Sequence, residues 1–338
     1  MAFLVPVSFL YGGLVRLRRV LFSIGMARSR KLPVRVISVG NLTLGGTGKT
    51  PVVIDIAGMF LKHHGCPVVL SRGYGRNNES EIIIVSDGST VLVDSRSGGD
   101  EPVLIATKLS TVPVVAGSDR CRAGLLALRK FNPNIVILDD GFQHLRLRRD
   151  IDIVLIDAAD PFGKQERLFP AGILREPVSA LKRADIVLIT RADHAVDLTG
   201  LTARIRKHCT APIFTSKMVP ADLIDIRSND LKPLSALRGT AVAAFSGIAR
   251  PASFLGMLRS LGAEIRSEIV FPDHHEYQKT DLAHIFQQAA DSRVSMIVTT
   301  EKDAIRLKTA PNEGVWALRL ELQIVEHDAW EKLLTAGG

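Results

Sequence analysis

An apolar run, a glycine-rich turn and a helix-like segment follow one another near the N-terminus. The run VRVISVG (34–40) is followed by NLTLGGTGKTP (41–51) and then by VVIDIAGMFLKHHG (52–65), which has helical periodicity. A strand, a loop ending in Gly-Lys-Thr and a helix are typical of a phosphate-binding loop, because backbone N–H groups and the helix N-terminus attract an anion. The sequence therefore predicts a binding site for a nucleoside triphosphate here rather than a glycine-rich turn without a ligand.

The loop departs from the usual pattern at one position, where Thr43 replaces the first glycine. That glycine only opens the turn, and the glycines that cradle the anion are present. The expected phosphate-binding residues are Thr43, Leu44, Gly45, Gly46, Thr47, Gly48, Lys49 and Thr50. Lys49 supplies a point charge for the β- and γ-phosphates, and the Thr50 hydroxyl is expected to bind Mg²⁺.

A second motif supplies the acidic residues that a triphosphate site needs for Mg²⁺. Asp139 and Asp140 follow the apolar run NIVIL (134–138), and Gly141 lets the chain turn after them. Carboxylates at the carboxyl end of a parallel strand face the crevice in which ligands bind. The pair would also mark an ordinary strand exit, but beside a phosphate-binding loop we expect it to serve the metal.

Two stretches offer a general base for a phosphoryl acceptor. GGDEP sets Asp100 and Glu101 between glycines and a proline, and FPDHHEY (271–277) sets Asp273 beside His274. An aspartate hydrogen-bonded to a histidine makes a base poised near neutral pH. Both stretches have ordinary explanations as well, because Asp before Glu-Pro is a good helix N-cap and a histidine pair in a loop is often a surface feature.

Three further loops leave the carboxyl ends of predicted strands. SRGYGR contains Tyr74, and PAGILREP contains Arg175, which could bind phosphate through two nitrogens, and Glu176, which could complete a metal shell. TRAD (190–193) weakly resembles the base-reading corner of nucleotide-switch proteins and is more simply explained as an ordinary strand exit. Because these loops leave the same edge of a parallel sheet, we expect them to converge on one crevice.

Short β-branched runs alternate with helix-like segments along most of the chain. The runs are apolar throughout, which indicates strands buried on both faces of a mostly parallel sheet. We predict an α/β fold of the doubly wound, P-loop NTPase-like class over residues 31–222, with a smaller α/β domain closing the active-site cleft over residues 223–338. The boundary falls where Pro, Asp and Ser interrupt the rhythm, in MVPADLIDIRSNDLKPLSALRGT.

Residues 1–30 stand apart because they contain no acidic residue, and their apolar run is too interrupted to span a bilayer. From position 10 onward they have the periodicity of an amphipathic helix. The leucines expected on one face are Leu10, Leu14, Leu17 and Leu21. Arg16 and Arg19 are expected to point away from that face. Such a helix suits an anionic membrane surface, and equally a helix docked on the protein's own core.

The composition narrows the choice of partners. The net charge of +8 and the pI of about 9.6 favour anionic partners. Aromatic residues make up only 5%, without the basic and aromatic interleaving that stacks bases, so nucleic acid is not expected. The three cysteines are far apart, so neither a zinc site nor a disulfide framework is suggested, and nothing implies an oligomer. A switch-type P-loop NTPase without an acceptor remains the alternative to a kinase.

Seven motifs, spread from Ser38 to Leu307, closely resemble those of the tetraacyldisaccharide 4′-kinase family, the lipid A pathway kinases of Gram-negative bacteria. They are SVGNLTLGGTGKTP, SRGYGR, GGDEP, DDGFQHLRLRRDIDIVLID, PAGILREP, FPDHHEY and TTEKDAIRL, and DDGFQH is the most specific. The resemblance implies that ATP, with Mg²⁺, phosphorylates the 4′-hydroxyl of an acylated glucosamine disaccharide 1-phosphate and gives lipid IVA. It also implies a peripheral protein on the cytoplasmic face of the inner membrane, with the N-terminal helix touching the bilayer.

The resemblance further implies roles for single residues. Asp100 pairs with His274 as the catalytic dyad, and Lys49 acts on the phosphates. The implied metal residues are Thr50, Asp139, Asp140 and Glu176. The residues implied to line the same site are Tyr74, Glu101, Gln143, His144 and Arg175.

Overall fold

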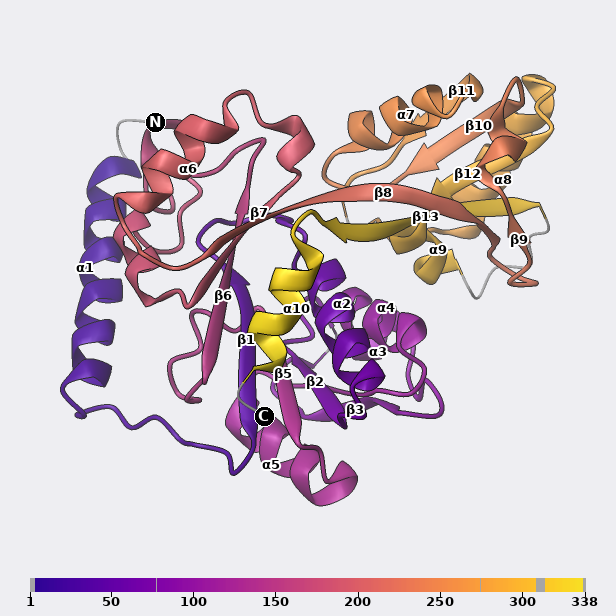
Figure 1. The fold of residues 1–338 in the computed structure, drawn as a ribbon. Coiled ribbons are helices and arrows are strands. Elements are labelled where there is room, and N and C mark those ends of the chain that lie inside the picture. The colour runs from indigo at the N-terminus through magenta and orange to yellow at the C-terminus, as the bar shows by residue number, and fades with distance from the viewer. Residues whose placement is uncertain (1–3, 77, 274, 308–313, 337–338) are drawn as a thin grey trace. The chain divides into compact units, whose positions relative to one another are not determined.

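The computed structural model describes residues 4–76, 78–273, 275–307 and 314–336 (Figure 1). The chain forms two compact units, unit 1 (Met1–Lys217 and Leu322–Gly338) and unit 2 (Met218–Glu321). It passes from one unit to the other inside two long strands, β8 (Ile213–Asp225) and β13 (Val315–Ile324). His274, one of the two expected dyad residues, lies outside the described residues.

Unit 1 is built on a mostly parallel sheet with the strand order β8-β7-β6-β1-β5-β2-β4-β3. The strands that belong to it entirely are β1 (Arg35–Asn41), β2 (Pro67–Ser71), β3 (Ile83–Asp87), β4 (Pro113–Ala116), β5 (Ile135–Asp139), β6 (Ile151–Asp157) and β7 (Ile186–Thr190). All the pairings are parallel except that of β3 with β4 at the edge. Every residue of β2, β5 and β7 is buried, as predicted for strands covered on both faces.

Helices cover both faces of this sheet. They are α2 (Lys49–Lys62), α3 (Ser95–Gly98), α4 (Asp100–Lys108), α5 (Arg120–Phe131), α6 (Leu198–Arg206) and α10 (His327–Thr335), with 3₁₀ turns η1 (Lys164–Glu166), η2 (Val178–Arg183) and η3 (Ala192–His194). Ala123 of α5 packs with Val68 and Leu70 of β2 in one core cluster. Helix α2 contacts the same strand but contributes nothing to that cluster, so it covers the other face. The predicted doubly wound α/β fold is confirmed.

Unit 2 repeats this construction on a smaller scale, with the strand order β11-β10-β12-β13-β8 and β9 beside β8. Its elements are β9 (Leu231–Lys232), β10 (Ala241–Ser246), β11 (Glu264–Val270), β12 (Met296–Thr300), α7 (Pro251–Ser260), α8 (Lys279–Asp291), α9 (Glu301–Leu307) and the 3₁₀ turn η4 (Leu234–Leu237). Leu258 of α7 packs with Val242, whereas Ile285 of α8 packs with Phe245 on the other face of β10. Alternation along β10 thus gives this unit two cores.

The two passages between the units bear on the expected boundary between residues 222 and 223. The first passage, between residues 217 and 218, lies close to the expected boundary. Strand β8 runs through the Pro- and Asp-containing stretch there without a break. The second passage returns residues 322–338 to unit 1. There the buried Trp330 of α10 makes an edge-to-face contact with Phe214 and donates its indole N–H to Asp55 over 3.2 Å.

The N-terminal helix α1 (Leu4–Ser23) is present, as predicted, and in the structure already includes residues before position 10. It attaches to unit 1 through its small and polar residues. Ser8 donates to the carbonyl of Leu168 over 3.0 Å, and a Cβ on Gly12 would come within 2.7 Å of the Leu168 side chain. The leucine face points the other way, with Leu10 68% and Leu14 59% exposed. Among the described residues, no helix combines the length and apolarity that crossing a membrane requires.

Candidate active site

The predicted phosphate-binding loop connects β1 to α2 at the carboxyl edge of the unit 1 sheet. Gly45 and Gly48 have φ values of 97° and 85°, a left-handed region that other residues rarely adopt. A Cβ placed on Gly45 or Gly46 would meet nothing within 4 Å. The loop therefore exposes its backbone to open space where an anion can approach, while Gly48 leads directly into α2 as its N-cap.

Lys49 is held at the start of α2 with its ammonium group inside the protein. Its side chain is 9% exposed, and Nζ lies 3.4 Å from Oδ1 of Asn41 and 3.6 Å from Oδ1 of Asp140. Thr50 beside it is also buried. A buried ammonium shared by one amide and one carboxylate is available to a phosphate, which is the role predicted for Lys49.

Asp139 ends β5 and is completely buried. Its Oδ2 accepts one hydrogen bond from Ser71 over 2.9 Å, while Oδ1 has no hydrogen-bond partner among the described residues. Burial, reinforced by the negative charge of Glu101, raises the pKa of Asp139 to about 7. Such an oxygen is costly to leave unpaired and is suited to bind a cation or a hydrogen-bond donor.

Asp140 follows directly, with a left-handed φ of 55° that turns its side chain toward two cations. Arg175 donates from Nη1 to both carboxylate oxygens, over 3.0 and 2.8 Å, and Lys49 lies beside it. Burial alone would raise the pKa of Asp140, but Lys49 and Arg175 outweigh burial and hold this pKa below its ordinary value. The two neighbouring carboxyls therefore differ: the pKa of Asp139 lies near neutral pH, so about half of it is protonated there, whereas Asp140 is ionised.

Glu176, an expected metal residue, has both oxygens engaged by Arg183 at 2.8 Å. It also accepts from the side-chain amide of Gln143 over 3.3 Å, and the same amide donates to the carbonyl of Asn41 over 2.9 Å. Gln143 thus bridges Glu176 to the strand that leads into the phosphate loop. Arg19, which was expected to point away from the leucine face, lies with its Nε 4.0 Å from Glu176.

His144 follows Gln143 in a largely buried position, and its Nε2 has no hydrogen-bond partner among the described residues. Burial, with the nearby positive charge of Arg120, lowers the pKa of His144 to about 4. The imidazole is therefore neutral at physiological pH, and any positive charge near it comes from arginines.

Asp100 is the first residue of α4, and Glu101 follows it. The proposed alternative for Asp100, a helix N-cap, is wrong, because the cap position is held by Gly99, with a φ of 91° and no side-chain cap. Glu101 acts on the pKa of Asp139 through space, which brings this helix start to the same edge of the sheet. Tyr74 lies on the loop after β2 and is 71% exposed.

The TRAD corner lies against the phosphate loop. Thr190 donates its hydroxyl to the carbonyl of Thr47 over 2.9 Å, and Arg191 donates to the carbonyl of Gly46 over 3.0 Å while pairing with Asp157. Through these contacts the TRAD corner helps to hold the backbone of the phosphate loop in place.

In unit 2, the stretch FPDHHEY follows β11. His275 stacks on Phe271 and shares a hydrogen bond of 2.9 Å with Asp281, and Asp273 lies 3.8 Å from the ammonium of Lys302. His274 belongs to the same stretch but falls outside the described residues, so its expected role stays a prediction.

Sequence reasoning missed several residues of this site. Arg120, at the start of α5, is 4% exposed, and Asp139 and Asp140 both act on its pKa. Asn41 binds Lys49, and Arg183 binds Glu176. The signal for Arg120 was its position directly after Asp119, which caps α5, because a helix that starts at the carboxyl edge of the sheet points its first residues at the ligands.

The residues present fit a nucleoside triphosphate with Mg²⁺. Three groups around the loop support this fit: the buried Lys49, an oxygen of Asp139 and the hydroxyl of Thr47. Neither of the last two has a hydrogen-bond partner in the described part of the chain. No group of three or more metal-ligating side chains occurs in the described part of the chain. Mg²⁺ commonly takes one or two carboxylates, waters and phosphate oxygens, so the aspartate pair is sufficient.

The comparisons with known proteins agree with this geometry. The family described as LpxK, tetraacyldisaccharide-1-phosphate 4′-kinase, matches residues 1–337. The chain belongs to the LpxK family. Tetraacyldisaccharide 4′-kinase from Pelobacter propionicus is 42% identical over 96% of this chain and 89% of the relative, and the one from Syntrophus aciditrophicus is 43% identical over 95% and 88%.

A crystal structure of LpxK from Aquifex aeolicus in complex with ATP has 34% identity to the chain and a TM-score of 0.79, covering 97% of this chain and 96% of that one. This chain is therefore an ATP-dependent LpxK kinase of lipid A biosynthesis, with a lipid disaccharide phosphate as substrate and Mg²⁺ beside ATP. The family predicted from the motifs is confirmed over the alternative of a switch-type NTPase.

Proposed function

We propose that the chain transfers the γ-phosphate of ATP to the 4′-hydroxyl of tetraacyldisaccharide 1-phosphate at the cytoplasmic face of the inner membrane, and that the residues around Lys49 carry out the transfer. The observation that carries the assignment of residues is the contact of buried Lys49 with Asp140, next to the unpaired oxygen of Asp139. A phosphate beside Lys49 and a cation beside Asp139 would fit that arrangement.

The phosphate loop from Thr43 to Thr50 binds the triphosphate through its backbone, and Lys49 neutralises the β- and γ-phosphates. Thr50, Asp139 and Asp140 would hold Mg²⁺, which supplies charge neutralisation when it is bound. Arg175 keeps Asp140 ionised and in place through its two hydrogen bonds. Glu176 is saturated by Arg183, which favours a role in positioning Gln143 over direct metal binding.

Asp100 is proposed as the group that accepts the proton of the acceptor hydroxyl, with His274 as its partner. Asp100 sits at a helix start whose next residue, Glu101, is close enough to Asp139 to change its pKa. Support for His274 comes from its motif alone. Glu101, Tyr74 and His144 remain proposed neighbours of the bound substrates.

The proposed membrane contact is made by α1. Leu10, Leu14 and Leu17 of its leucine face are exposed, Leu17 to 55%, which favours a membrane contact over docking of these leucines on the protein's own core. An exposed apolar face on a helix free of acidic residues suits the surface of an anionic bilayer.

One transfer assay tests both the proposed acceptor hydroxyl and the proposed general base. Wild-type protein, incubated with labelled ATP, Mg²⁺ and tetraacyldisaccharide 1-phosphate, is expected to give the 4′-phosphorylated lipid on chromatography. Asp100→Ala and His274→Ala should each lower kcat by about 100-fold or more while ATP still binds, because a general base contributes roughly 10²–10⁴-fold. Asp328→Ala, at an exposed position of α10, is the control. Near-normal transfer in Asp100→Ala would remove its assignment as the base.

The membrane contact is tested separately by replacing Leu10, Leu14 and Leu17 with serine. All three side chains are exposed, so the fold should hold while binding to vesicles of anionic phospholipid falls. Leu231→Ser, at an equally exposed leucine of unit 2, is the matched control. Unchanged vesicle binding in the triple variant would contradict the proposed role of α1.

A further inference from the structure

Thr43 stands where the usual phosphate-loop pattern has a glycine. The backbone does not require a glycine there, because Thr43 does not adopt a left-handed φ. It forms instead an antiparallel bridge with Leu174, next to a hydrogen bond of 2.7 Å from the N–H of Arg175 to the carbonyl of Leu42. The side chain of Thr43 is buried, so its contacts inside the protein can give this threonine a role.

Asn41, the last residue of β1, is completely buried and binds Thr43 through its side-chain amide. The amide nitrogen donates to the carbonyl of Thr43 over 2.9 Å and to the Thr43 hydroxyl over 3.3 Å. Because a carbonyl oxygen can only accept a hydrogen bond, the nitrogen of the amide, and not its oxygen, must face Thr43. The amide oxygen consequently faces Lys49, with 3.4 Å between Oδ1 and Nζ.

The amide oxygen of Asn41 is one of two acceptors beside the Lys49 ammonium. The other is Asp140, at 3.6 Å, and Arg175 donates to both oxygens of that carboxylate. A neutral amide holds the ammonium without cancelling its charge, so the charge remains available to a phosphate. The ammonium has three N–H donors and can keep the contact with Asn41 while it binds a phosphate oxygen.

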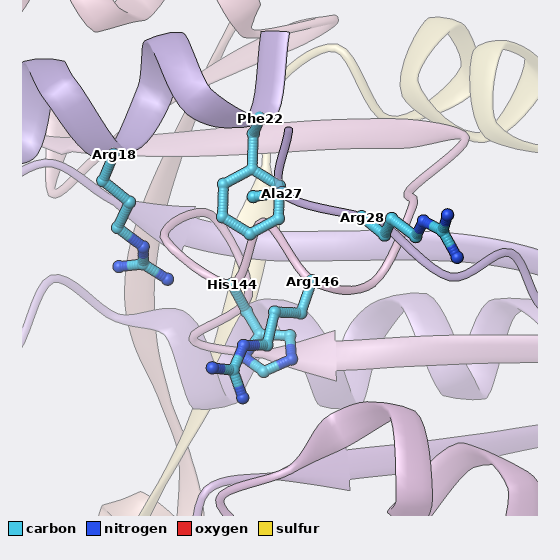
Figure 2. Close-up of a pocket in the computed structure, with 6 residues that line it drawn as sticks. All are labelled: Arg18, Phe22, Ala27, Arg28, His144 and Arg146. Carbon is cyan, nitrogen blue, oxygen red and sulfur yellow. The ribbon is translucent and has the colours of Figure 1, made fainter. Parts of the chain in front are cut away.

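The backbone of Asn41 is held separately, by the loop after β5. The side-chain amide of Gln143 in this loop donates to the carbonyl of Asn41 over 2.9 Å. The end of α1 restrains the loop in turn, because Arg18 donates to the carbonyl of Gln143 over 3.3 Å. Arg18 and His144, the residue after Gln143, line one hollow at that place (Figure 2). The contact with Thr43 therefore decides how the Asn41 amide is turned, while other contacts hold its backbone.

We propose that Asn41 and Thr43 are positioning residues for Lys49. Thr43 turns the Asn41 amide, and the amide oxygen sets the place of the ammonium that meets the triphosphate. The inference rests on the proposed function, in which Lys49 neutralises the β- and γ-phosphates. The threonine in the glycine position is then a requirement of this loop, so restoring the glycine of the usual pattern weakens the site.

The experiment measures the Kd of a non-hydrolysable ATP analogue with Mg²⁺ by titration calorimetry on the full chain, without lipid. Thr43→Val and Thr43→Gly should each raise this Kd about fivefold, the effect of one lost hydrogen bond, and Thr43→Ser should recover most of the affinity. Asn41→Leu, which removes the amide itself, should raise Kd about tenfold or more. Thr202→Val is the matched control, since that hydroxyl donates to the carbonyl of Leu198 within α6.

The Thr43 variants are also made in a Lys49→Ala background, where residues that act only through Lys49 should change Kd no further. Unchanged affinity in Thr43→Val and Thr43→Gly would overturn the proposal, and these two variants suffice if Asn41→Leu does not fold. Equal losses with and without Lys49 would also overturn it, because the Thr43 hydroxyl would then act on the phosphate or the loop directly. Absence of transfer to the lipid by the wild-type protein would instead refute the proposed function, with the coupling to Lys49 still measurable.

Discussion

Each unit has one completely buried aspartate, Asp139 at the end of β5 and Asp303 shortly after β12, and the two differ in their hydrogen-bond partners. Asp139 of unit 1 receives one hydrogen bond, from Ser71, and one of its oxygens has no partner among the described residues. Asp303 of unit 2, in the first turn of α9, accepts from the backbone of Gly247, from the hydroxyls of Tyr277 and Thr300, and from Arg306.

Burial raises the pKa of both carboxyls. A raised pKa alone therefore does not distinguish a ligand site from a structural one. The number of hydrogen-bond donors does distinguish them. Asp303 is saturated and links β10, β12 and the stretch after β11, whereas Oδ1 of Asp139 has no partner among the described residues and can accept one from a ligand. We expect Asp139 to matter for catalysis and Asp303 for stability.

The largest effect is expected for Asp139→Asn. The amide keeps the shape of the side chain but loses the charge that Mg²⁺ requires, so kcat should fall by about 100-fold or more. Because the variant also removes a poorly compensated buried charge, unit 1 should be no less stable than in the wild type. Transfer rates on the lipid acceptor and urea unfolding measure the two quantities. A variant that is active but unstable would reverse the comparison.

Asp303→Asn should show the opposite pattern. An amide in this position turns a donor toward groups that are themselves donors and leaves Arg306 without its carboxylate, which should cost unit 2 about 3 kcal/mol. The two tryptophans make the measurement specific, since Trp316 lies in unit 2 and Trp330 in unit 1. Unfolding is followed by Trp316 fluorescence in a Trp330→Phe background. A loss of kcat at temperatures where the variant is fully folded would mean that Asp303 also acts in transfer.

The pKa of Asp139 predicts a smaller, pH-dependent effect in the metal-free protein. This pKa of about 7 lies above the ordinary aspartate value of 3.8, so between these two pH values the folded state holds a proton that the unfolded state has released. The contribution to stability is therefore largest at low pH and declines as the pH rises toward 7, by up to about 1.4 kcal/mol per pH unit. The midpoint for Asp139→Asn should gain on the wild type between pH 5 and pH 8, with EDTA present. A constant difference would contradict the assignment.

The smallest effect is expected for Tyr277→Phe, which removes one of the four donors to Asp303. The loss of a single buried hydrogen bond should lower the stability of unit 2 by about 1 kcal/mol. Tyr74→Phe, at a tyrosine that is 71% exposed, is the control and should leave unfolding unchanged. An equal effect of both substitutions would show that the hydroxyl of Tyr277 adds nothing to the Asp303 network.

The local motifs were readable from the sequence because each one combines a strand, a turn and its chemistry within a dozen residues. Lys49 and Asp139 belong to this class, and both lie where the motifs predicted. Arg120 could not be found in this way, because its place beside the aspartates depends on how α5 crosses the sheet. A helical pattern alone assigns such an arginine to the solvent.

The orientation of α1 was unreadable for a different reason. Its pattern defines an apolar face and a polar face but does not state which of them meets the protein. In the structure, the face with Ser8 and Gly12 meets the protein, because these small residues allow a close approach to Leu168 that a leucine would prevent. The contact of Arg19 with Glu176 follows from that orientation, and the basic residues consequently serve the protein interior as well as its surface.

The hydroxyl of Tyr11 in α1 donates to the carbonyl of Arg175 over 2.9 Å, and Arg175 is the residue that clamps Asp140. Trimming the N-terminus to obtain a more soluble enzyme would therefore not be neutral. The shortened protein would lose a restraint on Arg175 and so on Asp140, a proposed Mg²⁺ ligand, and its turnover should fall even in detergent, where no bilayer is present. A defect in a truncated enzyme is thus no measure of how much the membrane contributes.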